Sequence, residues 1–270
     1  METFSNSNMR THTRISPNKS CPRGSSISKI TIHHVAGVMT VESIGNWFAT
    51  TSTKASSNYG VDSDGHIGLY VEEKDRAWTS SNSANDNVAV TIEVSNNAIG
   101  GNWPISDKAL QATIDLCVDI CRRNGIPALI YTGDAAGTLT LHKFFTATVC
   151  PGRYLEGKMS TIATTVTNRL VDCLNLETEV KAAALKLQSK GITCSYLYEN
   201  FHIIKDLGHL IIKLGNTPIV AGINKNITTV ATAITYLQEK HIIYDANYWL
   251  QNSGRVQFLD DLIIESAKVI

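Results

Sequence analysis

An internal repeat in the last third of the sequence constrains the fold more than any other feature. A pattern of apolar and polar residues returns 50 positions later, as Leu187 and Leu237 illustrate, and a Leu-x-x-Leu-Ile-Ile pattern at Leu207 returns at Leu259. Such a repeat indicates two copies of one small helical unit. Each copy has too few apolar residues to form a core alone, so we expect the copies to pack on each other or on a second chain, as in a homodimer. The matching residues are Val180, Ala183, Leu187, Gln188, Lys190, Ile192 and Tyr198, then Val230, Ala233, Leu237, Gln238, Lys240, Ile242 and Tyr248.

The part of the chain before the repeat mixes the spacing of strands with that of helices. The β-branched run from Val88 to Val94 indicates a central strand, and the turn residues Asp64 and Gly65 join two further predicted strands. This mixture predicts an α/β domain with a central mixed β-sheet flanked by helices. The predicted strands are 29–34, 59–61, 67–71, 88–94 and 128–131, and the predicted helices are 41–50, one with Ser106 as its N-cap, and one that includes Leu155 to Val166.

These patterns divide the chain into segments. Residues 1–28 are rich in Ser, Asn, Thr and Arg, which is typical of an extended arm that lies on a domain. We therefore predict this arm, an α/β domain at 29–172, a linker at 173–180 and a small all-α domain at 181–270. The repeats of that last domain cover about 181–215 and 229–270.

The composition argues against several classes of protein. Lys and Arg number 24, as do Asp and Glu, so the formal net charge is zero and gives no electrostatic reason to bind nucleic acid. No run approaches the roughly 20 apolar residues of a membrane helix, and the polar N-terminus lacks the pattern of a secretory signal. We expect a protein that does not insert into membranes and is made in a cytosol. Its six cysteines, without a C-x-x-C pair, are typical there of free or metal-bound thiols.

Two histidines and one cysteine form the most informative group of residues. His33 lies in the first predicted strand, and the loop between His142 and Cys150 is long enough to return both side chains to one ion. Two imidazoles and a thiolate suit zinc, and three protein ligands leave one tetrahedral position open, as catalytic zinc requires. The sequence therefore predicts zinc held by His33, His142 and Cys150.

Other residues compete for this role. His34 or His66 could bind the metal in place of His33. Cys117 and Cys121 are four residues apart and could also bind metal, but they share one helix face with apolar residues, which favours core packing.

Five separated motifs stand in a fixed order between about residues 10 and 170. They are Thr31-Ile32-His33-His34, the hairpin Tyr59-x-Val61-x-x-Asp64-Gly65, Ala77-Trp78, Val90-Thr91-Ile92-Glu93, and His142 with Cys150-Pro151-Gly152. In this order and spacing the sequence resembles the Amidase_2 family, which includes peptidoglycan recognition proteins, phage amidase endolysins and bacterial amidases. The arm, with Ser16-Pro17-Asn18 and Pro22-Arg23, looks most like that of endolysins from phages or prophages of Gram-positive bacteria.

The resemblance implies a zinc cleft on one face of the sheet and hydrolysis of the amide between the lactyl group of N-acetylmuramic acid and L-alanine. Some members use a Tyr as general base, but the matching position here is Ser57, so Glu93 is implied as the base. Thr148 matches a position that stabilises the oxyanion. We assign substrate contacts to Trp78 and His34.

The resemblance and the repeat together imply an endolysin whose C-terminal domain binds the cell wall. Such a protein is made in the host cytoplasm and then released to the wall. A non-catalytic peptidoglycan binder, a bacterial autolysin and a recycling amidase on the same fold are the alternatives. Some aromatic residues of the repeats would form a sugar platform or, equally, belong to the helix core; these are Tyr196, Tyr198, Tyr248 and Trp249.

Overall fold

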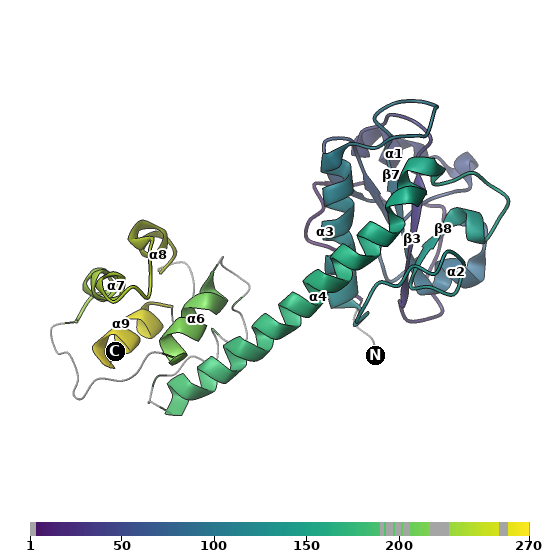
Figure 1. The fold of residues 1–270 in the computed structure, drawn as a ribbon. Helices are drawn as coiled ribbons and strands as arrows, with labels where there is room; N and C mark the ends of the chain where they lie inside the picture. The colour runs from purple at the N-terminus through teal and green to yellow at the C-terminus, as the bar shows by residue number, and fades with distance from the viewer. Residues whose placement is uncertain are drawn as a thin grey trace. The chain divides into compact units, whose positions relative to one another are not determined.

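The computed structural model describes residues 4–189, 192, 197, 201, 206–216, 227–253 and 259–269. The chain divides into two compact units, Met1–Val171 and Asp172–Ile270. Helix α4 (Gly152–Ser189) begins in the first unit and ends in the second, so residues 173–180, expected to be a linker, are helical throughout. Each unit has a buried core of its own, and Figure 1 labels the elements of both.

A six-stranded mixed sheet forms the centre of the first unit, which confirms the fold class expected from the sequence. Strands β3 (Lys29–His34) and β7 (Ala89–Val94) pair in parallel along their full length, so that His33 stands opposite Glu93. Strands β4 and β5 pair antiparallel, and the other neighbours pair in parallel. The order across the sheet is β1 (His12–Thr13), β5 (Ile67–Leu69), β4 (Tyr59–Val61), β7, β3 and β8 (Leu139–Leu141).

The predicted turn at Asp64 and Gly65 joins β4 to β5. Gly65 has a φ of +85°, a left-handed conformation that favours glycine. The buried Asp62 carboxylate accepts hydrogen bonds from the main-chain N–H groups of Asp64 and His66, both at 3.0 Å. Because the turn satisfies its own polar groups in this way, it holds β4 and β5 in register beside β7.

Two helices cover the apolar face of the sheet. Helix α3 (Asp107–Arg123) begins after the predicted cap Ser106, whose side chain accepts a hydrogen bond from the first turn. Side chains alternate along a strand, so Ile32 on β3 faces this layer. It belongs to one buried cluster with Leu116 of α3 and Leu155 of α4.

The opposite face of the sheet is polar near its centre. Thr31 on β3 has its Oγ1 2.9 Å from that of Thr140 on β8, and Asn85 of helix α2 (Ser83–Val88) donates to Thr31 at 3.0 Å. His33 follows two residues later on this same face. Helix α1 (Val41–Phe48) and the 3-10 helix η1 (Thr51–Thr53) follow β3 in the chain and precede β4.

The N-terminal arm contributes strands as well as irregular chain. Strand β1 extends the edge of the large sheet, and β2 (Lys19–Ser20) pairs antiparallel with β6 (Arg76–Ala77) in a second sheet. Arg23 is buried, and its guanidinium donates to the main-chain oxygen atoms of Glu73 and Asp75. Strands of two residues leave no periodicity in a sequence, so the composition of the arm could not reveal them.

The predicted strand at 128–131 is wrong, because this segment is irregular. The main-chain N–H of Leu129 donates to Thr167 Oγ1 at 3.0 Å, and that hydroxyl donates back to the Leu129 carbonyl at 3.1 Å. The N–H of Ile130 donates to Thr138 Oγ1 at 2.8 Å. The threonine hydroxyls therefore form hydrogen bonds with main-chain groups that would otherwise pair with a neighbouring strand.

The described part of the second unit is helical, as predicted for the C-terminal domain. Residues from both copies of the repeat lie in one buried cluster, Leu187 and Leu237 among them. Trp249 belongs to this cluster, which supports its interpretation as a core residue. Lys190, Cys194, Tyr196 and Tyr198 fall outside the described residues. None of the described helices combines the length and the apolar character needed to cross a membrane. The described helices after α4 are α6 (Leu207–Asn216), α7 (Val230–Glu239), α8 (Ala246–Ser253) and α9 (Leu259–Val269).

Candidate metal centre

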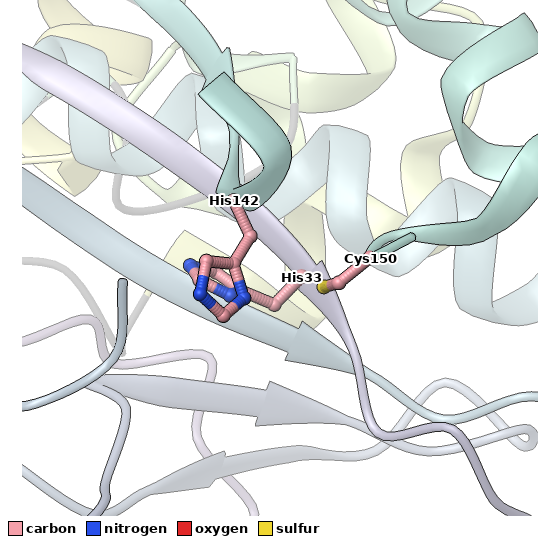
Figure 2. A group of neighbouring side chains, drawn as sticks. All are labelled: His33, His142 and Cys150. Atoms are coloured by element: carbon pink, nitrogen blue, oxygen red, sulfur yellow. The ribbon is translucent and has the colours of Figure 1, made fainter. Parts of the chain in front are cut away.

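The fold brings His33, His142 and Cys150 together at the carboxyl edge of the sheet. His33 lies near the end of β3, His142 follows β8 and opens the 3-10 helix η2 (His142–Phe144), and Cys150 precedes α4. Because β3 and β8 are parallel neighbours, their carboxyl ends meet at this edge. One ligand atom from each of the three side chains lies within 4.8 Å of the other two, and Figure 2 shows the side chains converging.

His33 is buried and His142 is half-buried, and their buried ring nitrogens lack the hydrogen bonds that such atoms normally make. Both ring nitrogens of His33, and Nε2 of His142, have no hydrogen-bond partner among the described residues. Each such atom costs about 1–3 kcal/mol when buried. Burial, followed by the proximity of His142 and His34, lowers the pKa of His33 well below its usual range, so the ring is neutral and keeps a lone pair. Unpartnered nitrogen atoms on neutral rings beside a thiol fit a bound metal cation.

The ring of His142 is held from its other side. Burial lowers the pKa of His142, whereas the Asp86 carboxylate and a hydrogen bond with the Ser80 main chain act in the opposite direction. Asp86 fixes this segment, because its carboxylate accepts from the Ser80 hydroxyl at 2.6 Å and from the main-chain N–H groups of Ser80 at 3.1 Å and Thr79 at 3.0 Å. Asp86 therefore orients the ring through a loop, a role that sequence reasoning missed because the contact joins distant segments.

Cys150 is buried beside the two imidazoles. Its Sγ accepts a hydrogen bond from the main-chain N–H of His34 at 3.4 Å, and its own N–H donates to Thr148 Oγ1 at 3.2 Å. Burial, followed by the charge of Glu93, raises the pKa of this thiol, while the His34 N–H acts in the opposite direction. The sulfur therefore needs a cation beside it to be a thiolate at neutral pH.

Glu93 stands next to His33 on the neighbouring strand. Its Oε1 lies 4.0 Å from His33 Nδ1, which is too long for a hydrogen bond, and its Oε2 is buried without a partner among the described residues. Burial raises the pKa of Glu93 to about 8. A carboxyl group with a pKa near neutrality can both accept and return a proton.

The remaining predicted site residues differ in their surroundings. Thr148 is half-buried and adjoins Cys150 through the hydrogen bond given above. Trp78 is partly exposed, and its Nε1 donates to Ser20 Oγ at 2.9 Å, so its ring is held at the surface. The ring of His34 is buried, so a supporting role suits it better than contact with substrate.

The alternative ligands are not part of the group. His66 has a largely exposed side chain, and its Nδ1 lies 3.1 Å from Asp62 Oδ2. Cys117 and Cys121 are buried in the core of the first unit, as helix spacing predicted. Ser57, at the position where some family members have Tyr, donates its hydroxyl to the Tyr59 carbonyl at 2.7 Å and is fully buried.

Comparisons with known proteins identify the first unit. The protein-family model described as "Amidase_2: N-acetylmuramoyl-L-alanine amidase" matches residues 23–153. No curated protein matches the chain. Similar solved structures include that of PlyL, with 18% identity, a TM-score of 0.48, and coverage of 58% of this chain and 97% of that one. An AmpD derivative has 14% identity, a TM-score of 0.45, and coverage of 60% and 99%.

A third similar structure is the endolysin N-acetylmuramoyl-L-alanine amidase LysCS from Clostridium intestinale, with 15% identity, a TM-score of 0.42, and coverage of 60% of this chain and 97% of that one. The identification depends on the family model, which spans all five motifs in full. Residues 23–153 therefore match the N-acetylmuramoyl-L-alanine amidase family Amidase_2, and the protein is an amidase.

Proposed function

We propose that this chain is a zinc-dependent endolysin that hydrolyses the amide between the lactyl group of N-acetylmuramic acid and L-alanine in bacterial peptidoglycan. One observation carries the proposal: within an Amidase_2 domain, the ligand atoms of His33, His142 and Cys150 lie within 4.8 Å of one another. A non-catalytic binder on this fold would have no need to keep all three side chains together.

The three side chains would hold the metal through two nitrogen atoms and one sulfur. Zinc supplies a Lewis acid for the substrate carbonyl and lowers the pKa of a water molecule to about 7. The protein contributes neutral imidazoles, since burial lowers the pKa of both His33 and His142. Three protein ligands leave a fourth position for water or substrate, as in catalytic rather than structural sites.

Glu93 is the proposed general base. It would take a proton from the attacking water and return it to the leaving amine of L-alanine. Its support is a buried carboxyl with a pKa near 8 beside His33. Ser57 does not compete for this role, because its hydroxyl is buried and donates to a main-chain carbonyl.

Thr148 is the proposed donor to the oxyanion that forms on the substrate carbonyl. Its Oγ1 accepts from the Cys150 N–H, so the hydroxyl proton remains available to donate. A hydroxyl carries no charge, so Thr148 stabilises the oxyanion less than the cation beside it does.

Metal analysis together with mass spectrometry of digested cell wall tests this function. We expect about one zinc per chain, and new L-alanine amino termini on the products. Cys150→Ser and His142→Ala should lose both zinc and product, whereas Cys117→Ala, which removes another buried thiol, should keep both. Undiminished cleavage by Cys150→Ser would exclude the zinc mechanism.

The C-terminal unit is proposed to bind the cell wall and so to raise the local concentration of substrate. Its support is the second compact unit and its separate core. Trp249 is buried, so it does not contribute to a sugar-binding surface. A protein that ends at Leu176 should still cut soluble muropeptides but sediment less with intact walls, and equal sedimentation would contradict the targeting role.

A further inference from the structure

A cluster of buried residues adjoins Cys150 and has no role in the mechanism above. It consists of His34, Asn96 and Gly152, together with the half-buried Trp103, and these residues come from three segments of the chain. Asn96 is fully buried at its centre, directly after β7 and Ser95. Burying an amide costs free energy unless its nitrogen and oxygen atoms form hydrogen bonds. Those of Asn96 do.

The Asn96 side chain joins the strand that carries His33 to the loop after β7. Its Nδ2 donates to the Trp103 carbonyl at 3.0 Å and to the Pro104 carbonyl at 3.4 Å. Its Oδ1 therefore faces the His34 ring, where it lies 3.1 Å from Nδ1. Since Oδ1 can only accept, Nδ1 of His34 carries the proton, and the ring is fixed in one orientation.

The cluster also contacts the residues that follow Cys150. The His34 ring meets the Trp103 ring edge-on, with centroids 5.2 Å apart. Trp103 has a φ of +58°, a left-handed conformation that is unfavourable for a residue with a side chain. A Cβ on Gly152 would lie 2.9 Å from Trp103 Cβ and 3.4 Å from His34 Cε1, so these side chains pack directly on the start of α4.

One hydrogen bond connects this cluster to the proposed zinc ligand. The main-chain N–H of His34 donates to Cys150 Sγ at 3.4 Å. An N–H bond to a thiolate withdraws electron density from sulfur, so the bound metal keeps more of its Lewis acidity. The strength of this bond depends on where the His34 main chain lies, and the Asn96 and Trp103 contacts fix its side chain.

We propose that Asn96 is a positioning residue for the metal centre: through His34 it aims a main-chain N–H at the Cys150 sulfur and so sets the strength and character of the metal–thiolate bond. This inference rests on the proposed zinc function. Partners outside the ligand set typically contribute 10- to 100-fold in metal affinity or activity, and we expect an effect of that size from Asn96.

Two substitutions and their combination test the role of Asn96. Asn96→Ala removes the amide, and His34→Phe keeps an aromatic ring but removes Nδ1. Each should weaken zinc binding about 10- to 100-fold in competition with a chelator, and each should shift the sulfur-to-metal charge-transfer band of the cobalt-loaded protein. Because both act through one hydrogen bond, the double variant should bind zinc about as weakly as either single variant.

Asn18→Ala is the matched control. Asn18 is also a buried amide that donates to two carbonyls, those of Phe48 at 3.1 Å and Thr50 at 2.9 Å, but its described hydrogen bonds do not involve His34 or Cys150. Asn18→Ala should lower the free energy of unfolding without moving the cobalt band. A cobalt band in Asn96→Ala that matches the wild type, or effects of Asn96→Ala and His34→Phe that multiply in the double variant, would overturn the proposal.

If the variants do not fold, a measurement on the unaltered protein tests the hydrogen bond from the His34 N–H to the Cys150 sulfur. In 15N-labelled protein loaded with 113Cd, a hydrogen bond to the metal-bound sulfur should produce a scalar coupling between cadmium and the His34 amide proton. Absence of that coupling overturns the proposal. If the wild-type protein binds no zinc, the amidase proposal fails as well, whereas normal wild-type binding with unaffected variants refutes the role of Asn96 alone.

Discussion

Oε1 of Glu93 lies 4.0 Å from Nδ1 of His33, across two strands that pair residue against residue. The parallel register of β3 and β7 thus places the proposed general base beside a proposed metal ligand, with both residues on strands rather than on loops. Both groups lie on the polar face of the sheet, and the two ring nitrogens of His33 and Oε2 of Glu93 are buried without hydrogen-bond partners among the described residues. Sites built on strands in this way hold their geometry more tightly than sites on loops.

Glu93→Gln should lower kcat by about 10²- to 10⁴-fold, the usual contribution of a general base. The amide has nearly the same shape but cannot accept the water proton, so zinc content should stay at the wild-type level. Steady-state kinetics on soluble muropeptides, with metal analysis of the same sample, measures both. Glu72→Gln, at a surface carboxylate paired with Lys74, is the control and should leave kcat unchanged. Near-normal turnover by Glu93→Gln would assign the base elsewhere.

The metal-free protein should lose stability as pH rises through neutrality because of Glu93. Burial raises the pKa of this carboxyl from 4.5 to about 8, so between these values the folded state holds a proton that the unfolded state releases. The free energy of unfolding should therefore fall with rising pH, with a slope approaching about 1.4 kcal/mol per pH unit.

Urea unfolding between pH 6.5 and 8 tests this dependence, with wild type compared against Glu93→Gln. Burial lowers the pKa of His33 and His142, so these groups contribute an opposite slope, which fades as the pH rises above the ordinary histidine value of 6.5 and is common to wild type and variant. The slope of the variant's profile should be more positive than that of the wild type throughout this window. Parallel profiles would mean that the Glu93 carboxyl is ionised in the folded protein.

Thr148→Val should reduce kcat by roughly tenfold or more, because removal of an oxyanion donor typically costs more than a factor of ten. Thr148→Ser keeps the hydroxyl and should recover most of the activity. The valine variant also removes the acceptor for the Cys150 N–H, so zinc affinity must be measured alongside the kinetics. If both variants lose activity equally, the hydroxyl is not the group that matters.

Thr167→Val should destabilise the protein by about 1–3 kcal/mol without changing metal content. The Thr167 hydroxyl satisfies both the N–H and the carbonyl of Leu129, and valine can satisfy neither. Thr164→Val, at an exposed position of the same helix, is the control and should change the free energy of unfolding by no more than about 0.5 kcal/mol. Urea denaturation of both variants gives the comparison, and equal effects would show that loss of the hydroxyl anywhere on the helix, rather than loss of its bonds to Leu129, is responsible.

The sequence was most informative where local chemistry and strand alternation agree. Imidazole and thiol groups are the side chains that zinc prefers, and His33 lies at the end of a strand whose alternation is visible in the sequence. The turn at Gly65 and the cap at Ser106 were predictable for the same reason, since each depends on a residue type and its immediate neighbours.

The sequence was uninformative where a polar side chain replaces a main-chain partner from a distant segment. Residues 128–131 have the apolar character of a strand, yet Thr167 and Thr138 take hydrogen bonds that a strand would make. Asp86 and Asn96 were missed likewise, because their effect on His142 and Cys150 passes through a third segment. No spacing rule relates residues that meet only after the sheet has formed.

Gly152 limits how this enzyme can vary. A side chain there would collide with Trp103, and the φ of +82° disfavours any replacement even if Trp103 gave way. A library randomised at this one codon should therefore return glycine almost alone among active clones. Laboratory evolution of the loop that carries Trp103 would have to substitute residues around Trp103 and Gly152 rather than these two residues.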